Sequence, residues 1–157
     1  YRKMLLLDSG LLLRWLNMTG DTSELTAQIL THSATDLVNK GALTEMIAGL
    51  ELLRYRTPNM RHELFYWVRK AKNAQAEVDY LATYQSEVLP IEVKAGTQGG
   101  MKSLWQFMRE KKLKNAIRAS LENFDVFTYT DTEEEATRTV WVCPLFALSQ
   151  INKVITD

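Results

Sequence analysis

The sequence predicts a mixed α/β (α+β) domain in which helices flank a central mixed sheet. Apolar and polar residues alternate along Val78–Tyr84 and Val88–Lys94, on either side of a short polar break at Gln85–Glu87. Such a pattern is typical of an antiparallel hairpin. Before the hairpin, apolar residues recur at helical spacing from Asp36 to about Arg56. Helices and strands that follow one another in this way favour a sheet with helices packed on it.

Length and charge limit the class of protein. The chain has 157 residues, 46% of them hydrophobic, which suits one domain with a real core. Its 19 basic and 19 acidic side chains give no net charge, unlike a strong nonspecific nucleic-acid binder, although a local basic surface remains open. Cys143 is the single cysteine, so we expect a reducing, cytoplasmic location. No apolar run is long enough to cross a bilayer, and no membrane partner is expected. Because the chain begins at Tyr1, we expect it to be a piece of a longer protein.

Residues 1–34 predict a helical lead-in that packs on a domain spanning residues 35–157. Asp8-Ser9 and Asp21-Thr22-Ser23 can each cap a short helix. Neither helix is long enough to be stable by itself. Both must therefore pack on the rest of the chain.

Two neighbouring strips run along the helix predicted from Asp36. One is apolar and forms the expected core face: Leu43, Met46, Ile47, Leu50 and Leu53. The other has small residues around one acid: Ala42, Glu45, Ala48, Gly49 and Leu52. Small residues allow close approach to a sheet, which would bring Glu45 near the packed surface. The alternative is a solvated glutamate on the helix flank, and Glu51, round the helix from Glu45, competes for the same role.

The remaining elements follow from short apolar runs. Four further strands are predicted: Glu63–Arg69, Asn115–Leu121, Phe124–Thr130 and Thr137–Cys143. Residues 70–75 predict a polar connection, and residues 131–135 predict a solvated acidic loop. One helix is expected over residues 101–112, and a closing helix after Pro144. The cations at the end of the first of these helices either complement its dipole or form a phosphate-facing patch. They are Arg109, Lys111, Lys112 and Lys114, and Arg118 follows beyond them.

The hairpin places charged residues opposite one another. A four-residue turn that ends at Glu87 pairs Asp79 with Glu92 and Glu77 with Lys94. Two carboxylates directly across a strand pair repel each other. A fold tolerates them when a cation lies between them, and Lys94 or a divalent metal ion could supply that charge.

An acid on the long helix, then an aspartate and a Glu-x-Lys on the hairpin, resemble the PD-(D/E)XK, or restriction-endonuclease-like, superfamily. The four positions are Glu45, Asp79, Glu92 and Lys94. The surrounding segments resemble, in order, the C-terminal domain of unknown function that a large family of prokaryotic AAA-type ATPases carries. These segments are DSGLLLRWL, KGALTEMIAGLELL, AEVDYL, LPIEVKAG, KSLWQFM, AIRASLENF and CPLFAL. The resemblance covers nearly the whole chain.

This resemblance implies a restriction-endonuclease-like fold and metal-assisted hydrolysis of phosphodiester bonds in DNA or RNA. In that chemistry Asp79 and Glu92 hold Mg²⁺ or Mn²⁺ through hard oxygen ligands, and the backbone carbonyl of Val93 adds another. The metal polarises the phosphoryl oxygen and lowers the pKa of a bound water. Lys94 orients that water or stabilises charge on the phosphate. Glu45 supplies a further ligand, directly or through water.

Two other interpretations stay open. The domain can be a non-catalytic recognition or regulatory module, because the fold hosts such members. Alternatively, Lys94 neutralises Asp79 and Glu92 in a structural ion-pair cluster. One position departs from the superfamily's name, since Val78 rather than proline precedes the aspartate. The resemblance also implies a partner, the ATPase part of the same polypeptide, through which the chain can form oligomers.

Overall fold

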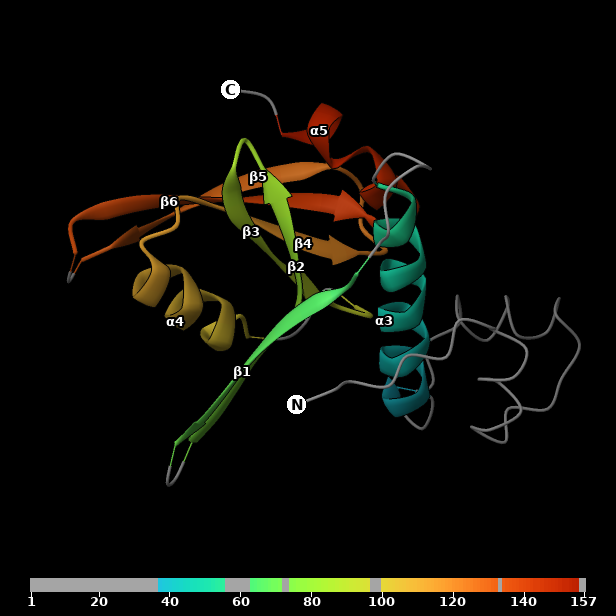
Figure 1. Cartoon of the computed structure of the whole chain (residues 1–157), viewed down its shortest axis with the longest axis horizontal. Helices are drawn as coiled ribbons and strands as arrows, with labels where there is room; N and C mark the ends of the chain where they lie inside the picture. Colours follow the sequence, from blue (N-terminus) through green and yellow to red (C-terminus); the bar gives the residue numbers. More distant parts are fainter. Residues whose placement is uncertain (1–36, 56–62, 72–73, 97–99, 133, 156–157) are drawn as a thin grey trace, which may run out of the picture.

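The computed structural model describes residues 37–55, 63–71, 74–96, 100–132 and 134–155 (Figure 1). The predicted lead-in, residues 1–34, lies outside the described residues. The elements in chain order are α3 (Leu37–Arg54), β1 (Phe65–Ala71), β2 (Ala74–Tyr84), β3 (Glu87–Val93), α4 (Lys102–Lys111), β4 (Asn115–Ser120), β5 (Asp125–Asp131), β6 (Ala136–Pro144), the 3-10 helix η2 (Leu145–Gln150) and α5 (Ile151–Val154).

Six strands form one sheet in the order β1-β2-β3-β4-β6-β5. The strands β1, β2 and β3 pair antiparallel, the strands β3, β4 and β6 pair parallel, and β5 is antiparallel to β6. The predicted mixed α/β fold class, with a mixed sheet flanked by helices, is therefore confirmed (Figure 1). Because β3, β4 and β6 are parallel, their carboxyl ends lie at the same edge of the sheet.

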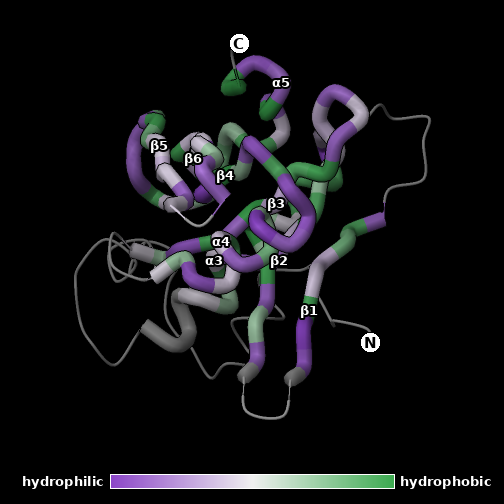
Figure 2. Tube along the Cα trace, turned by 90° about the vertical axis from the view of Figure 1, so that its left-hand side faces the viewer, coloured by the Kyte–Doolittle hydropathy of each residue, from purple (hydrophilic) through white to green (hydrophobic). Residues whose placement is uncertain are grey.

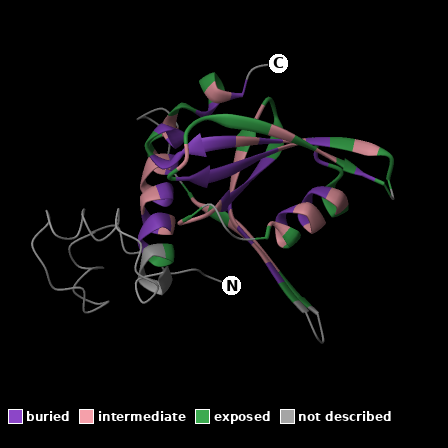
Figure 3. Ribbon diagram, turned by 180° about the vertical axis from the view of Figure 1, so that it is seen from behind, coloured by how far each residue is buried: buried purple, intermediate pink, exposed green. Residues whose placement is uncertain are grey.

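Helices cover both faces of the sheet. The elements α3, η2 and α5 pack on one face, where Ile91 of β3 and Ile117 of β4 belong to their common core. Helix α4 packs on the other face, where Leu104 and Ala116 belong to a second core. Ala116 and Ile117 are consecutive residues of one strand, so the two cores lie on opposite faces, which we call the α4 face and the α3 face. Figure 3 shows the buried residues concentrated on the central strands and on the side of α3 that meets them.

The β2–β3 hairpin has the predicted register from Tyr84–Glu87 to Tyr80–Ile91, whereas the predicted pairs of Asp79 with Glu92 and of Glu77 with Lys94 lie beyond the paired positions. Tyr84 at the end of β2 pairs with Glu87 at the start of β3. Gln85 and Ser86 form the turn between them, with φ of 47° and 67°. Positive φ at both central residues is the pattern of a type I′ turn, whose twist matches that of the two strands.

Strand β2 carries a bulge where it faces β1. A single β1 residue, Tyr66, faces two β2 residues, Asp79 and Tyr80. The bulge shifts the alternation of side chains, because Val78 and Leu81 pack with the core on the α4 face whereas Tyr80 packs on the α3 face. Strict alternation along the strand would place Val78 and Tyr80 on one face. The prediction of an uninterrupted alternating strand is therefore wrong at this point.

Two predictions of local structure are also wrong. Residues 70–75 are not one polar connection, because β1 continues to Ala71 and β2 begins at Ala74. Their polarity reflects a projecting hairpin whose β1 strand becomes hydrophilic towards its end (Figure 2). The closing helix is divided into η2 and the short α5. None of the helices in the described ranges is long and apolar enough to cross a membrane.

The predicted acidic loop, residues 131–135, begins with Asp131, which is the last residue of β5 and carries a buried charge. Asp131 is only 1% exposed. Its Oδ2 accepts a hydrogen bond from Arg109 Nε at 2.8 Å and lies 3.7 Å from Arg138 Nη2. Arg138 Nη1 donates to the backbone oxygens of Met108 and Leu113 at 3.2 and 2.7 Å. The prediction of a solvated loop is therefore wrong at Asp131, because two arginines compensate its charge.

Candidate functional site

The candidate site lies where the pairing of β2 with β3 ends. The paired positions end at Tyr80 and Ile91. Asp79 precedes Tyr80 in β2, and its Oδ2 accepts a hydrogen bond from the backbone N–H of Val93 at 2.7 Å. The side chain thus takes the place of a backbone acceptor in the ladder. The bulge at Asp79 brings its carboxylate to the backbone of β3, between Glu92 and Lys94.

Glu92 and Lys94 form an ion pair at this end of β3. Lys94 Nζ donates to Glu92 Oε1 at 2.6 Å, and their side chains are 22% and 9% exposed respectively. Ile91, their neighbour, packs in the core on the α3 face. Because side chains alternate along a strand, Glu92 and Lys94 lie on the α4 face. The backbone N–H of Lys94 donates to the oxygen of Ala119 at 2.8 Å, which fixes this end of β3 against β4.

Arg118 of β4 is a neighbour that sequence reasoning did not place here. It lies beside Glu92 in the parallel register and is 9% exposed. Its Nη2 donates to the backbone oxygen of Gly96 at 3.2 Å and forms an ion pair with Glu122 at the same distance. Arg118 therefore holds the start of the loop after β3. The signal available in the sequence was one arginine within the otherwise uncharged strand NAIRAS.

Glu45 of helix α3 lies beside Tyr80, the residue after Asp79, on the α3 face, whereas Glu92 and Lys94 lie on the α4 face. The backbone oxygen of Glu45 accepts a hydrogen bond from the Tyr80 hydroxyl at 2.8 Å. Burial, together with the negative charges of Glu45 and Asp79, raises the pKa of the Tyr80 hydroxyl above its ordinary value. Both carboxylates are thus close enough to the Tyr80 hydroxyl to disfavour its ionisation. Glu51, the expected competitor, instead forms an ion pair with Arg54 of the same helix at 2.7 Å.

Ala48 explains why this part of α3 lies so close to the sheet. It belongs to the strip of small residues and has no exposed surface, and Leu52 on the same strip is 7% exposed. Both belong to the core on the α3 face. The small side chains let the helix backbone approach β2 closely enough for the bond between Tyr80 and Glu45.

The oxygen atoms around Asp79 suit a hard cation. In a strand, the N–H and C=O of one residue point towards the same neighbouring strand. The Val93 carbonyl therefore points to the side on which Asp79 accepts the Val93 N–H. Carboxylate and carbonyl oxygens are the ligands that Mg²⁺ and Mn²⁺ prefer. Within the described ranges, no group of three or more His, Cys, Asp or Glu side chains is arranged to hold a metal ion.

Comparison with known proteins identifies the family. No curated protein and no solved structure matches the chain. The model of one family, described as Domain of unknown function (DUF4143), matches residues 40–148. The match contains all the candidate positions discussed above and covers more than half of the chain. The chain therefore belongs to the family described as Domain of unknown function (DUF4143).

Proposed function

We propose that this chain is a nuclease-like domain that hydrolyses phosphodiester bonds of DNA or RNA with Mg²⁺ or Mn²⁺. Its activity would be controlled by an ATPase part of the same polypeptide, as the resemblance to the AAA-type ATPases implies. One observation carries the proposal: Asp79 Oδ2 lies 2.7 Å from the Val93 backbone nitrogen, between Glu92 and Lys94 in the chain. This bond supports the proposal because it joins Asp79 to the β3 residue that separates Glu92 from Lys94, at one end of the hairpin.

The donor set fits the metal in its chemistry. Asp79, Glu92 and the Val93 carbonyl would hold the ion, and Glu45 would act on it only through water, since the three acids do not form one group of ligands in the described ranges. All of these donors are oxygens, which select hard divalent cations. When bound, the ion would polarise a phosphoryl oxygen and lower the pKa of a bound water.

Lys94 has the chemistry for the remaining role. An ammonium group can donate hydrogen bonds to a phosphate oxygen or to the attacking water, and it compensates negative charge that develops on the phosphate. Its ion pair with Glu92, at 2.6 Å, fixes the position of the ammonium in advance. Arg118, bonded to the Gly96 carbonyl at 3.2 Å, would keep the loop after Lys94 in place.

A second candidate function is a non-catalytic recognition or regulatory module of the ATPase. The observation that favours it is the same ion pair between Lys94 and Glu92. Lys94 can neutralise the acids without any metal, and the cluster would then stabilise the end of the hairpin. In this case the domain would bind nucleic acid or protein and would have no hydrolytic activity.

Metal titration and a cleavage assay distinguish the nuclease from the non-catalytic module. Calorimetry with Mg²⁺ and Mn²⁺ compares the parent chain, Asp79→Ala and the control Asp125→Ala. Asp125 is a suitable control because its carboxylate also accepts a backbone N–H, that of Val126 at 2.8 Å, on an exposed strand. Metal binding that is lost only in Asp79→Ala supports the site.

Cleavage is then measured on linear, nicked, branched and single-stranded DNA and on RNA, with the chain alone and joined to its ATPase. Loss of cleavage in Asp79→Ala, but not in Asp125→Ala, supports the nuclease. Absence of metal binding and of cleavage on every substrate would contradict the nuclease and favour the module.

A further inference from the structure

Helix α4 and the turn after it concentrate positive charge on a neutral protein. Residues 102–114, KSLWQFMREKKLK, contain five basic side chains and one acidic side chain, a net charge of +4, whereas the whole chain has no net charge. Lys102, Lys111, Lys112 and Lys114 are all exposed. A local concentration of this kind creates a positive potential that attracts polyanions.

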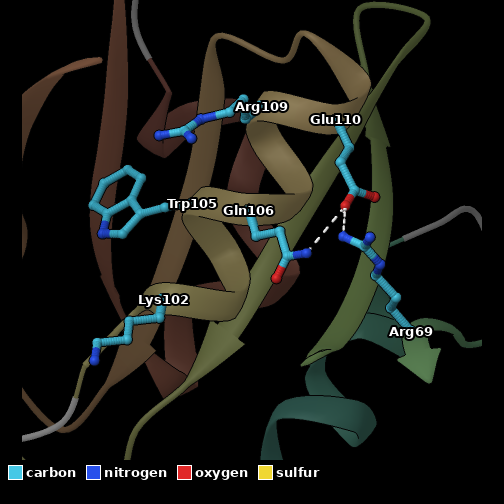
Figure 4. A pocket seen from close by; sticks show the side chains of 6 residues that line it. All are labelled: Arg69, Lys102, Trp105, Gln106, Arg109 and Glu110. Atoms are coloured by element: carbon cyan, nitrogen blue, oxygen red, sulfur yellow. Dashed lines mark hydrogen bonds and ion pairs between the residues drawn. The ribbon is translucent and has the colours of Figure 1, made fainter. Parts of the chain in front are cut away.

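The outward side of α4 is also hollowed. A hollow of about 480 Å³ is lined by Arg69, Lys102, Trp105, Gln106, Arg109 and Glu110. Figure 4 shows that Lys102 and Trp105 project from one side of the helix and that Glu110 meets Arg69 of β1 on the other side, with Gln106 between them. The lining thus combines three cations with one large aromatic ring.

The ring of Trp105 is held in place by the edge strand β5. It stacks on Tyr129 with ring centroids 4.6 Å apart and an interplanar angle of 26°. It also meets Phe127 edge-on, with centroids 6.4 Å apart. An aromatic ring that is already fixed loses little conformational freedom when a flat ligand stacks on it.

The two arginines of the hollow are fixed as well. Arg109 Nε donates to Asp131 at 2.8 Å, and Asp131 lies buried below the surface. Arg69 pairs with Glu110, whose position is supported by Gln106 at 3.1 Å. Glu110 compensates Arg69 and Asp131 compensates Arg109, so the remaining positive charge comes from Lys102 in the lining and from the exposed Lys111, Lys112 and Lys114 at the end of the helix and after it.

We propose that this surface, Lys102 to Lys114 with the stacked ring of Trp105, binds a single strand of nucleic acid. The lysines and Arg109 would contact successive phosphates, and one base would stack on Trp105. Grooves that bind single strands combine these two features, a track of positive charge and aromatic rings for the bases. The inference deepens the proposed nuclease function and rests on it, because only residues 95–101 separate Lys94 from the first residue of α4. A strand held along α4 would therefore lead towards Lys94.

Fluorescence anisotropy tests the surface with labelled oligothymidylate and oligouridylate of about 12 nucleotides, within the range of known site sizes. The double variant Lys102→Gln/Lys112→Gln is expected to weaken binding. It should also reduce the slope of log affinity against log salt concentration by about 1.4, since each contact to a single-strand phosphate contributes about 0.7. The control Lys153→Gln removes an exposed lysine on α5, on the opposite face, and should leave both quantities unchanged.

The stacking contact has its own variants. Trp105→Leu keeps apolar packing and removes the ring, and it should weaken binding by about tenfold or more, whereas Trp105→Phe should retain most of the affinity. Thermal unfolding is measured for each variant, and if Trp105→Leu does not fold, the lysine variant decides. Binding that is unchanged in the lysine variant, absent for both oligonucleotides, or tighter for a duplex of the same length would overturn the proposal.

Two further measurements separate this proposal from the nuclease function. The parent chain should bind the oligonucleotides as tightly in chelator as it does with Mg²⁺, because the surface on α4 includes none of the proposed metal ligands. The lysine variant should retain Mg²⁺ binding. Oligonucleotide binding in a chain that cleaves nothing would support the surface on α4 and refute the nuclease. Cleavage with the same Michaelis constant in the parent and in the lysine variant would refute the surface and leave the nuclease intact.

Discussion

The carboxylate of Asp79 completes the β2–β3 ladder by accepting the backbone N–H of Val93 at 2.7 Å. A backbone carbonyl would occupy that position if the antiparallel pairing continued. The bulge in β2, where Asp79 and Tyr80 together face Tyr66, moves the β2 backbone out of register and leaves room for the side chain. The Asp79 carboxylate therefore has a structural role in the hairpin. A test of its catalytic role must be designed so that the two effects can be told apart.

Substitutions at Asp79 separate the two tasks. Asp79→Asn keeps an acceptor for the Val93 N–H, so the free energy of unfolding in chelator should change by less than about 1 kcal/mol. Asp79→Ala loses the bond and should cost about 1.5–3 kcal/mol. Mg²⁺ at about a hundred times its Kd should stabilise the parent chain by about 2.7 kcal/mol, and neither variant should respond. Thermal and urea unfolding with and without Mg²⁺ measure all three quantities. An Asn variant that is far less stable than the parent in chelator would support the structural ion-pair cluster instead.

The hairpin could be predicted from the sequence because local chemistry determines it. Alternation on both sides of a polar break defines the two strands, and Gln85 and Ser86 occupy the turn. The bulge at Asp79 could not be predicted, since it depends on how β1 pairs with β2, and the sequence predicts a longer connection between these strands. The small residues beside Glu45 allow a close approach to the sheet, so the sequence predicts its closeness to the packed surface as one of two alternatives.

Long-range pairing accounts for most of what the sequence did not predict. Arg118 is a neighbour of Glu92 only because β4 pairs parallel to β3, and no local pattern encodes that pairing. Asp131 begins an acid-rich segment of the kind that is usually solvated, but it ends β5, and its burial depends on Arg109 and Arg138 from other elements. The charged residues of the site can therefore be recognised in the sequence, whereas the residues they interact with can be identified only from the structure.

The turn between β2 and β3 can be improved. Gln85 and Ser86 both have positive φ, which costs free energy for residues with a side chain. The double substitution Gln85→Asn/Ser86→Gly should raise the free energy of unfolding by about 1 kcal/mol, because Asn-Gly suits a type I′ turn. Ser103→Gly in helix α4 serves as the control and should lower stability by about 0.5 kcal/mol. A loss of stability in the turn variant, measured by urea unfolding, would contradict the turn geometry.

The buried network at Asp131 should contribute strongly to stability. Asp131→Asn removes the buried acid between Arg109 and Arg138; the Arg138 side chain is 3% exposed and, among the described residues, keeps only its ion pair with the more exposed Glu134. Removing one partner of a buried ion pair leaves the other charge poorly compensated, and we expect a loss of about 3 kcal/mol. Glu135→Gln removes an exposed acid from the same loop and should change stability by less than about 0.5 kcal/mol. Equal effects in the two variants, measured by urea unfolding, would show that the network contributes little.

We expect the protein to lose stability at high pH, because the thiol of Cys143 is buried. Burial raises the pKa of its thiol from 9.0 to about 12. Above pH 9 the thiol ionises in the unfolded chain but not in the folded one, so the unfolded state binds fewer protons and stability falls until about pH 12. Tyr80, whose pKa is also raised, acts in the same direction. The difference in unfolding free energy between the parent chain and Cys143→Ala should therefore shrink above pH 9. A constant difference, or rapid reaction of the folded chain with a thiol reagent at pH 8, would contradict the burial of Cys143.

Lys94 distinguishes a catalytic site from a structural one. Lys94→Ala should leave Mg²⁺ binding intact, because an ammonium group is not a metal ligand. If the domain is a nuclease, the same change should lower the cleavage rate by about 10²–10³-fold, which is typical when one electrostatic group of a transition state is removed. If the ion pair with Glu92 is structural, the change should mainly lower the free energy of unfolding and leave no rate to lose. Calorimetry, cleavage and urea unfolding of the parent chain, Lys94→Ala and the control Lys153→Ala measure these outcomes. Cleavage that persists in both Asp79→Ala and Lys94→Ala would come from a contaminant, and the nuclease assignment would then fail.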